Sequence, residues 1–386
     1  MTPRLNPSIA TLSAPPIPVV QGWGRAYDGA RGPLIDLSQA VPGYPPHPRM
    51  LRWLAEAAAS PEACAYGAIE GEDSLRAAYA GETASLYGAT ISARNIHITS
   101  GCNQAFVVAS MAVAGPGDRV LLTNPCYFNH ETTLAMQGIG VDYVTLQPET
   151  GFLPDPARVA AALTPGRKAL ALVSPNNPTG AVYPPPLLKD LFDLCAARGV
   201  WLILDETYRD FLPDAGAPHG LFAEPHWADT LIGLYSFSKS FCIPGHRVAA
   251  ITAGESVVEA VAKIMDNVQI CAPRAAQMAL AKALPALADW CAENRAEIAR
   301  RRVALIAAVA QNPDWQIGAI GAYFAFLRHP WPERTSLDVA QQLATQNGII
   351  TIPGRFFGAD QDEWLRLAFA NADAPTLATL ADRLRD

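Results

Sequence analysis

The chain has 386 residues, of which 50% are hydrophobic and 17% are charged, so it can bury a large core and is not a disordered protein. Acidic residues outnumber basic residues by 36 to 29, which gives a formal net charge of −7. Nucleic acid and anionic lipid both attract basic surfaces. We therefore expect no nucleic acid and no membrane among the partners of this chain.

The seven cysteines include no C-x-x-C pair, and the seven histidines include no H-x-x-x-H pair. A disulfide framework or a zinc site requires clustered spacing, so we expect reduced thiols, no metal and a cytoplasmic location. No apolar run reaches the roughly 18 residues of a membrane span. The first 20 residues lack the continuous apolar segment of a signal peptide.

The amino-terminal part is rich in proline, and residues 1–48 are expected to form an extended arm that ends in turns. A helix is predicted over about 50–59. From 94 to 253, apolar β-branched runs alternate with helical stretches, which is typical of βαβ units in a mostly parallel sheet with helices on both faces. The predicted strands are 95–99, 119–122, 141–146, 169–173, 200–204, 230–235 and 247–252, and a helix is predicted over 104–114.

The pattern changes after about residue 285. A long amphipathic helix is predicted over 288–310, followed by an apolar run at 322–327, a helix near 337–345, strands at 348–352 and 364–369, and a last helix from 375. These elements indicate a smaller α+β domain. We therefore predict an α/β protein with a large domain (45–285) and a second part composed of the amino-terminal arm (1–44) and a small carboxyl-terminal domain (286–386).

Polar residues gather where the predicted strands end, which is where open α/β sheets bind ligands. The strand at 169–173 is followed by the sequence SPNNPTG, the strand at 200–204 by DETY, and the strand at 230–235 by SFSKS. The sequence Ser100-Gly-Cys-Asn103 opens a helix, whose free N–H groups form an anion site.

These groups fit a phosphorylated aldehyde cofactor with a basic ring nitrogen. Arg247 and Ser236 suit a phosphate monoester. Lys239, one of five lysines in the chain, lies beside that cationic site, where a lowered pKa would make it an amine able to form a Schiff base. Asp205 is placed to keep a ring nitrogen protonated. Tyr208 could reach the ring hydroxyl.

The segments SPNNPTG, DETYRDF and SFSKSFCIPGHR, taken together, resemble the signature motifs of the class I/II aminotransferases, pyridoxal-phosphate enzymes of fold type I related to aspartate aminotransferase. The similarity runs from PGYPPHP at 42–48 to LRLAFA at 365–370. The resemblance implies pyridoxal 5′-phosphate as cofactor. It also implies that Lys239 carries the cofactor and shuttles the substrate proton, that Asp205 pairs with the ring nitrogen, and that Tyr208 and Asn177 bind the phenolic oxygen.

The resemblance implies further roles by matching position. Arg366 would grip the substrate α-carboxylate, Tyr127 would stack on the cofactor ring, His130 would bond Asp205, and Tyr66 would reach the phosphate of a neighbouring subunit in a homodimer. The phosphate cup would be formed by Gly101, Cys102, Asn103, Ser236 and Arg247.

Two positions depart from the family pattern. Ala40 stands where a glycine usually lets its backbone approach the substrate carboxylate, and Cys102 stands where alanine or threonine is common. The first departure bears on the shape of the substrate pocket, and the second is compatible with binding through the backbone N–H.

The leading prediction is an aminotransferase that moves an α-amino group from an amino acid to a 2-oxo acid. A pyridoxal-phosphate-dependent C–S β-lyase on the same fold is the alternative, and the sequence does not separate the two. A non-catalytic ligand sensor resembling the effector domains of some transcription regulators would need a DNA-binding head, for which the arm is too short. The donor and acceptor stay open, and Trp23, Tyr27 and Tyr44 are compatible with an apolar or aromatic substrate side chain.

Overall fold

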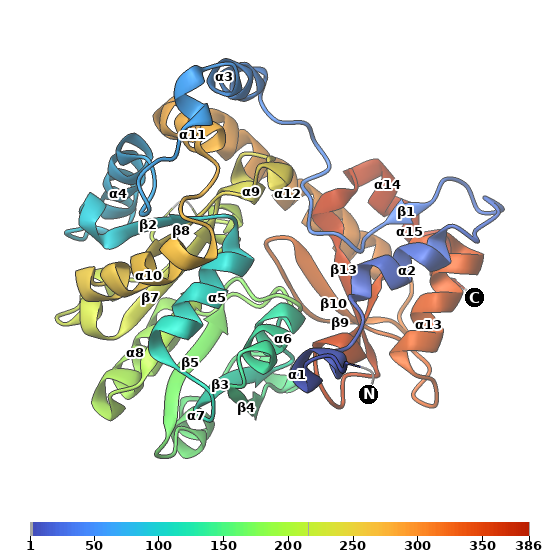
Figure 1. The fold of residues 1–386 in the computed structure, drawn as a ribbon. Helices are drawn as coiled ribbons and strands as arrows, with labels where there is room; N and C mark the ends of the chain where they lie inside the picture. The colour runs from blue at the N-terminus through green and yellow to red at the C-terminus, as the bar shows by residue number, and fades with distance from the viewer. Residues whose placement is uncertain (1–2, 215, 386) are drawn as a thin grey trace.

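The computed structural model describes residues 3–214 and 216–385. Figure 1 shows a large part built around a seven-stranded sheet and a smaller part that contains most of the carboxyl-terminal elements. The strands are β1 (Ile35–Asp36), β2 (Ile96–Thr99), β3 (Arg119–Asn124), β4 (Gly140–Thr145), β5 (Arg167–Val173), β6 (Trp201–Asp205), β7 (Leu231–Ser236), β8 (Ala249–Thr252), β9 (Gln316–Gly321), β10 (Phe324–Arg328), β11 (Ile349–Ile350), β12 (Ile352–Pro353) and β13 (Trp364–Ala368).

The α-helices follow the same chain order. They are α1 (Pro7–Ala10), α2 (Pro16–Gly24), α3 (Pro48–Ala58), α4 (Asp73–Tyr87), α5 (Cys102–Val113), α6 (Phe128–Met136), α7 (Pro156–Ala162), α8 (Pro185–Arg198), α9 (Phe237–Ser240), α10 (Glu255–Val268), α11 (Arg274–Ala286), α12 (Ala288–Val309), α13 (Ser336–Gln342), α14 (Ala374–Ala378) and α15 (Leu380–Arg383). None of the helices in the described ranges is long and apolar enough to cross a membrane.

The large sheet has the strand order β2-β8-β7-β6-β5-β3-β4. Strand β8 runs antiparallel to β2 and β7, and every other neighbouring pair is parallel. The carboxyl ends of β2, β5, β6 and β7 therefore meet at one edge of the sheet, and β8 begins at that same edge. This topology brings together loops that are far apart in the sequence.

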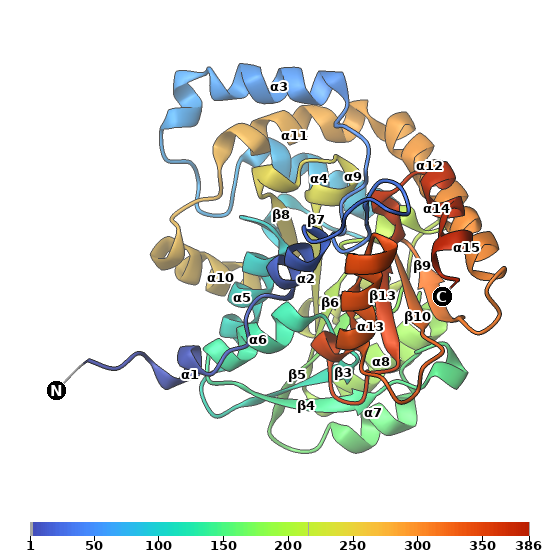
Figure 2. The same ribbon diagram turned by 90° about the vertical axis from the view of Figure 1, so that its right-hand side faces the viewer.

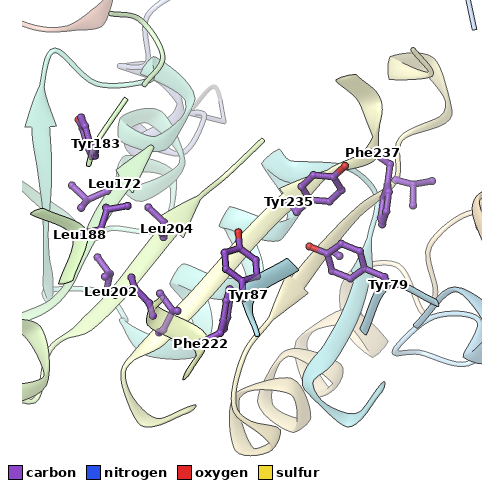
Figure 3. Packing of buried hydrophobic residues seen from close by; sticks show 14 of the residues in the cluster. Tyr79, Tyr87, Leu172, Tyr183, Leu188, Leu202, Leu204, Phe222, Tyr235 and Phe237 are labelled. Atoms are coloured by element: carbon purple, nitrogen blue, oxygen red, sulfur yellow. The ribbon is translucent and has the colours of Figure 1, made fainter. Parts of the chain in front are cut away.

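Both faces of the large sheet are buried, because successive side chains of a strand point to opposite sides. Leu172, Leu202 and Leu204 point to one face, where they pack with residues of α4, α8 and α11 (Figure 3). Ala171 and Ile203 point to the other face and belong to a separate cluster with residues of α5, α6 and α10. The predicted α/β architecture with helices on both faces is confirmed.

The smaller part contains the antiparallel sheet β12-β13-β10-β9, which shares a core with α12, α14 and α15. The amino-terminal arm is attached to this part, since β1 pairs in parallel with β11 and places Ile35 opposite Ile349. Figure 2 shows the arm passing from α1, beside α6, to α2, beside α13. The arm thus spans both parts of the molecule.

The expectation of an extended arm is wrong where α1 and α2 form. Each of these helices carries a proline in its first turn, Pro7 and Pro16. A first-turn N–H has no helical partner, so a proline costs nothing there and its fixed φ favours the helix. The strand predicted over 348–352 is also corrected, because β11 pairs with β1 whereas β12 pairs with β13.

Candidate active site

A cavity of about 230 Å³ lies at the sheet edge where β5, β6 and β7 end. Its lining consists of side chains from the loops that follow these strands, from the start of α5 and from the turn before β8: Cys102, Asn103, Tyr127, Val173, Asn177, Asp205, Thr207, Tyr208, Ser236, Ser238, Lys239, Pro244 and Arg247. Register explains part of this convergence, since Val173 pairs with Asp205. The cavity therefore unites the residues expected to contact a cofactor, with the exceptions of Gly101 and Tyr66.

Lys239 lies on the short helix α9, directly after β7, and its Nζ donates a hydrogen bond of 2.6 Å to the carbonyl oxygen of Ala40. Burial, followed by the positive charges of Arg247 and Arg366, lowers the pKa of Lys239 to about 8. At pH 7 about a tenth of these side chains are then neutral amines, far more than for an ordinary lysine, and the neutral amine is the form that acts as a nucleophile or proton acceptor.

Asp205 is buried at the end of β6 and has three donors around its carboxylate. The backbone N–H of Thr207 donates to Oδ1 at 2.9 Å, Cys102 Sγ lies 3.4 Å from Oδ2, and His130 Nε2 lies 3.5 Å from Oδ2. Burial by itself raises the pKa of Asp205, but His130 and Thr207 outweigh it and hold that pKa below the usual value. Asp205 is thus an anion inside the cavity.

A cradle suited to an anion lies at the end of the cavity formed by the start of α5 and Arg247. Gly101 precedes α5 with a φ of +90°, and a Cβ at this position would overlap the guanidinium of Arg247. The hydroxyl of Ser238 is buried and has no hydrogen-bond partner among the described residues. A free hydroxyl donor, a guanidinium and a helix N-terminus together fit a phosphate group, so these residues fit pyridoxal phosphate.

Arg366 is buried on β13 and joins the two parts of the molecule. Its Nη1 donates to Oδ1 of Asn177 at 3.1 Å and its Nη2 donates to the carbonyl oxygen of Ser38, whereas its Nε has no partner among the described residues. The rings of Phe324 and Phe357 lie 4.9 and 5.2 Å from the guanidinium carbon. Burial lowers the pKa of Arg366 to about 10, so it remains a cation that can pair with a carboxylate.

Two phenols complete the cavity. Asn129 Nδ2 donates to the Tyr127 hydroxyl at 2.8 Å, and that hydroxyl lies 3.4 Å from Oδ1 of Asn103. Burial raises the pKa of Tyr127 to about 12 and raises the pKa of Tyr208 well above its usual value. Both phenols are therefore protonated donors at neutral pH. His130 stacks on Phe106 with ring centroids 3.8 Å apart.

Other candidates lie away from this cavity. Tyr66 is 80% exposed and does not line the cavity of its own chain. Tyr27 packs beside Gly348, and neither Trp23 nor Tyr44 lines the cavity. The arm aromatics therefore give no direct support for an aromatic substrate.

Sequence reasoning missed Ser238 and Thr207, which line the cavity. Their positions inside the motifs SFSKS and DETY were a usable signal, because each lies next to a residue already singled out. It also missed Ser38, whose carbonyl oxygen accepts from Arg366.

Comparisons with known proteins identify the family of the chain. The family model "Aminotransferase class I and II" matches residues 32–384. The aromatic aminotransferase ISS1 of Arabidopsis thaliana is 29% identical over 361 residues, covering 91% of this chain and 89% of that protein. An aspartate aminotransferase of Sulfolobus acidocaldarius is 28% identical over 316 residues, covering 79% of this chain and 78% of that protein.

Two solved structures have the same fold. A double mutant of Thermus thermophilus aspartate aminotransferase matches with a TM-score of 0.90 at 24% identity, covering 99% of each chain. YbdL from Escherichia coli, described as having a methionine aminotransferase function, matches with a TM-score of 0.90 at 25% identity, covering 100% of this chain and 99% of that one. These relatives are aminotransferases, so the C–S lyase alternative is not favoured. The chain belongs to the class I and II aminotransferase family and is a pyridoxal-phosphate-dependent aminotransferase.

Proposed function

We propose that this aminotransferase takes its amino group from α-amino acids with uncharged side chains and passes it to 2-oxo acids. One observation carries the proposal. The charged side chains that line the cavity are Asp205, Lys239 and Arg247, and each is matched to a part of the cofactor. With Arg366 kept for the α-carboxylate, no lining residue in the described ranges supplies another cation for a second carboxylate.

The roles of the residues follow from their chemistry. When bound, pyridoxal phosphate supplies an aldehyde that condenses with amines and a ring that accepts the electron pair left on the substrate Cα. Lys239 Nζ holds and moves the proton at the substrate Cα, for which its lowered pKa suits it. Asp205, as a buried anion, keeps a proton on the ring nitrogen. Tyr208 and Asn177 bind the phenolic oxygen.

The phosphate is assigned to the cradle of Gly101, Cys102, Asn103, Ser236 and Arg247, to which we add the free hydroxyl of Ser238. Tyr127 stacks on the ring and His130 supports Asp205 from below. Arg366 orients the substrate by its α-carboxylate, with the Ala40 carbonyl close to the reacting lysine. This assignment uses each charged group of the cavity once.

An aromatic surface supports the choice of an uncharged side chain. The ring of Tyr127 lies 5.0 Å from that of Phe128, and Phe128 lines a second cavity of about 620 Å³ between the arm and α6. The second cavity also contains Arg355, which is half-exposed and pairs with Asp362 at 3.4 Å. Adjacent aromatic rings, Tyr127 in the first cavity and Phe128 in the second, therefore lie between the two cavities.

The test is a panel of amino donors with a fixed 2-oxo acid, comparing methionine, leucine and phenylalanine with aspartate and glutamate. We expect kcat/KM for the best uncharged donor to exceed that for aspartate by at least about tenfold, since a dicarboxylate would leave one carboxylate unpaired in the cavity. The variant Arg355→Gln is the matched probe. If aspartate is the best donor and Arg355→Gln abolishes its use alone, the proposed substrate class is wrong.

We further propose a homodimer in which Tyr66 reaches the phosphate of the neighbouring site, supported by its 80% exposure and by its position outside the lining of the active-site cavity. Light scattering measures the dimer, and Tyr66→Phe should weaken binding of the cofactor.

The domain division at 45–285 and a cytoplasmic location are also proposed. The second of these is supported by seven cysteines that form no disulfide.

A further inference from the structure

Behind the cavity, one carboxylate oxygen accepts two hydroxyl donors. Asp210 lies in the short 3-10 turn Arg209–Phe211 that follows Tyr208. The Tyr235 hydroxyl donates to its Oδ2 at 2.6 Å, and Ser240 Oγ donates to the same oxygen. The two hydroxyl oxygens lie 3.0 Å apart, so the three groups form a closed set.

Each member of this set is one or two residues from a residue of the cavity. Ser240 directly follows Lys239, Tyr235 directly precedes Ser236, and Asp210 comes two residues after Tyr208. Asp210 and Ser240 are separated by 30 residues of sequence. The Asp210 carboxylate therefore ties the loop that follows β6 to the turn that carries the lysine.

An arginine lies beside the Asp210 carboxylate. Arg209 Nε lies 3.8 Å from its Oδ1, and the Arg209 guanidinium carbon lies 4.1 Å from the centroid of the Tyr235 ring. Figure 3 shows Tyr235 in the same buried cluster as Tyr79 and Tyr87, whose rings also lie within 6 Å of that guanidinium. Hydrogen bonds to an ionised acceptor are about twice as strong as neutral ones, so this link is stiffer than a contact between two hydroxyls.

A second acid responds to the charge of Asp210. The pKa of Glu82, on α4, is raised to about 7 by burial and by the negative charge of Asp210. On the other side, Cys291 Sγ lies 3.7 Å from the backbone oxygen of Ser240. The turn that holds Lys239 is contacted from α4, where the rings of Tyr79 and Phe237 lie 5.3 Å apart, from α12 and from the loop after β6.

From this arrangement we propose that Asp210 is a positioning residue of the aminotransferase reaction, which fixes the direction of Lys239 by holding Ser240. The proposal rests on the role assigned to Lys239 above. Proton transfer by a side chain depends on the placement of its reacting atom, and a misplacement of about 1 Å can lower a rate about a hundredfold. Loss of the link should therefore lower kcat and leave binding of the amino acid largely intact.

The experiment compares the full-length, cofactor-loaded variants Asp210→Ala, Asp210→Asn, Ser240→Ala and Asp210→Ala/Ser240→Ala. We expect kcat per cofactor-loaded site to fall at least about tenfold in Asp210→Ala, with KM for the amino acid changed less than about twofold. Asp210→Asn keeps an oxygen acceptor and should lose less. Because both single substitutions break the same link, the double variant should be no slower than Asp210→Ala.

The control is Asp338→Asn. Asp338 also accepts a hydrogen bond from a hydroxyl, that of Thr335 at 2.6 Å, but it lies outside both cavities. A purely structural role would lower the thermal midpoint or the cofactor affinity while kcat per loaded site stays at the wild-type value, and that result would overturn the proposal. Additive losses in the double variant would also overturn it. If Asp210→Ala fails to fold, the comparison of Ser240→Ala with wild type decides in the same way. Absence of transamination in the wild-type protein would instead refute the proposed function.

Discussion

The lowered pKa of Lys239 gives the most detailed prediction. In the protein without cofactor, the pKa of this amine is about 8 instead of the ordinary 10.5, because of burial and then of the charges of Arg247 and Arg366. At pH 8 about half of the side chains are then neutral, against about 0.3% of ordinary lysines, a difference of more than about one hundredfold. The neutral amine is the reactive form, so reactivity rises as the pH rises through the pKa.

The assay measures covalent labelling of cofactor-free protein by pyridoxal with borohydride, followed by mass spectrometry of the peptide that contains Lys239. Pyridoxal lacks the phosphate, so Arg247 affects the reaction through the lysine and not through phosphate binding. Nα-acetyllysine, treated in the same way, provides the ordinary pH profile. We expect the labelling rate to reach half its plateau near pH 8, and the variant Arg247→Gln to move that midpoint upward because one of the repelling charges is gone.

Two results would refute this reasoning. A midpoint close to that of Nα-acetyllysine would mean that the lysine is not perturbed by its surroundings. An unchanged midpoint in Arg247→Gln, with the protein still folded, would mean that the neighbouring charge does not contribute. The substitution Lys239→Ala must abolish the label, which confirms that the signal comes from this residue.

Three further predictions concern the cofactor and the substrate. Gly101→Ala should weaken pyridoxal phosphate binding at least about tenfold in an absorbance titration, because its Cβ would overlap Arg247. The control Gly117→Ala, with a similar φ of +89° and open space around it, should lower the unfolding free energy by only about 1–2 kcal/mol of backbone strain. Equal effects of the two substitutions on cofactor binding would contradict the assignment of the phosphate to this cradle. Asp205→Asn should lower kcat about a hundredfold or more because the ring nitrogen loses its anion, with Asp205→Glu retaining more activity, and a fully active Asp205→Asn enzyme would exclude this role. Arg366→Lys should weaken binding of the amino acid by about 1.5–3 kcal/mol, which raises its KM roughly ten- to a hundredfold with a smaller change in kcat. An unchanged KM would mean that the substrate α-carboxylate binds elsewhere.

Most of the residues that gather around the cavity could be predicted from the sequence. Asp205 and Ser236 each end an apolar run, and residues at the carboxyl ends of neighbouring parallel strands must meet at one edge. The position of Arg247 follows from the antiparallel direction of β8, because the short turn before that strand returns the chain to the same edge of the sheet. Local patterns sufficed here because the topology of a parallel sheet leaves few alternatives.

Other features depend on tertiary contacts that no local pattern reveals. The proline-rich segments that form α1 and α2 have the composition of an extended arm, so their sequence alone does not indicate helices. The packing of α1 against α6 and of α2 against α13 stabilises the helical conformation. The link between Asp210 and Ser240 joins two motifs through an ordinary acid and an ordinary serine. Whether Tyr66 meets a second subunit depends on a surface that a single chain does not contain.

The central claim is that this protein transfers an amino group and does not eliminate a leaving group. The most direct measurement is a single-turnover experiment on the cofactor-loaded enzyme without any 2-oxo acid, run with methionine and in parallel with S-methylcysteine, whose methylthio leaving group lies on Cβ. It follows the cofactor absorption spectrum and quantifies both the 2-oxo acid and ammonia. The account predicts a spectral change that runs to completion, one 2-oxo acid per active site and no free ammonia. Continued release of ammonia together with the 2-oxo acid, while the spectrum returns to its starting form, would contradict it.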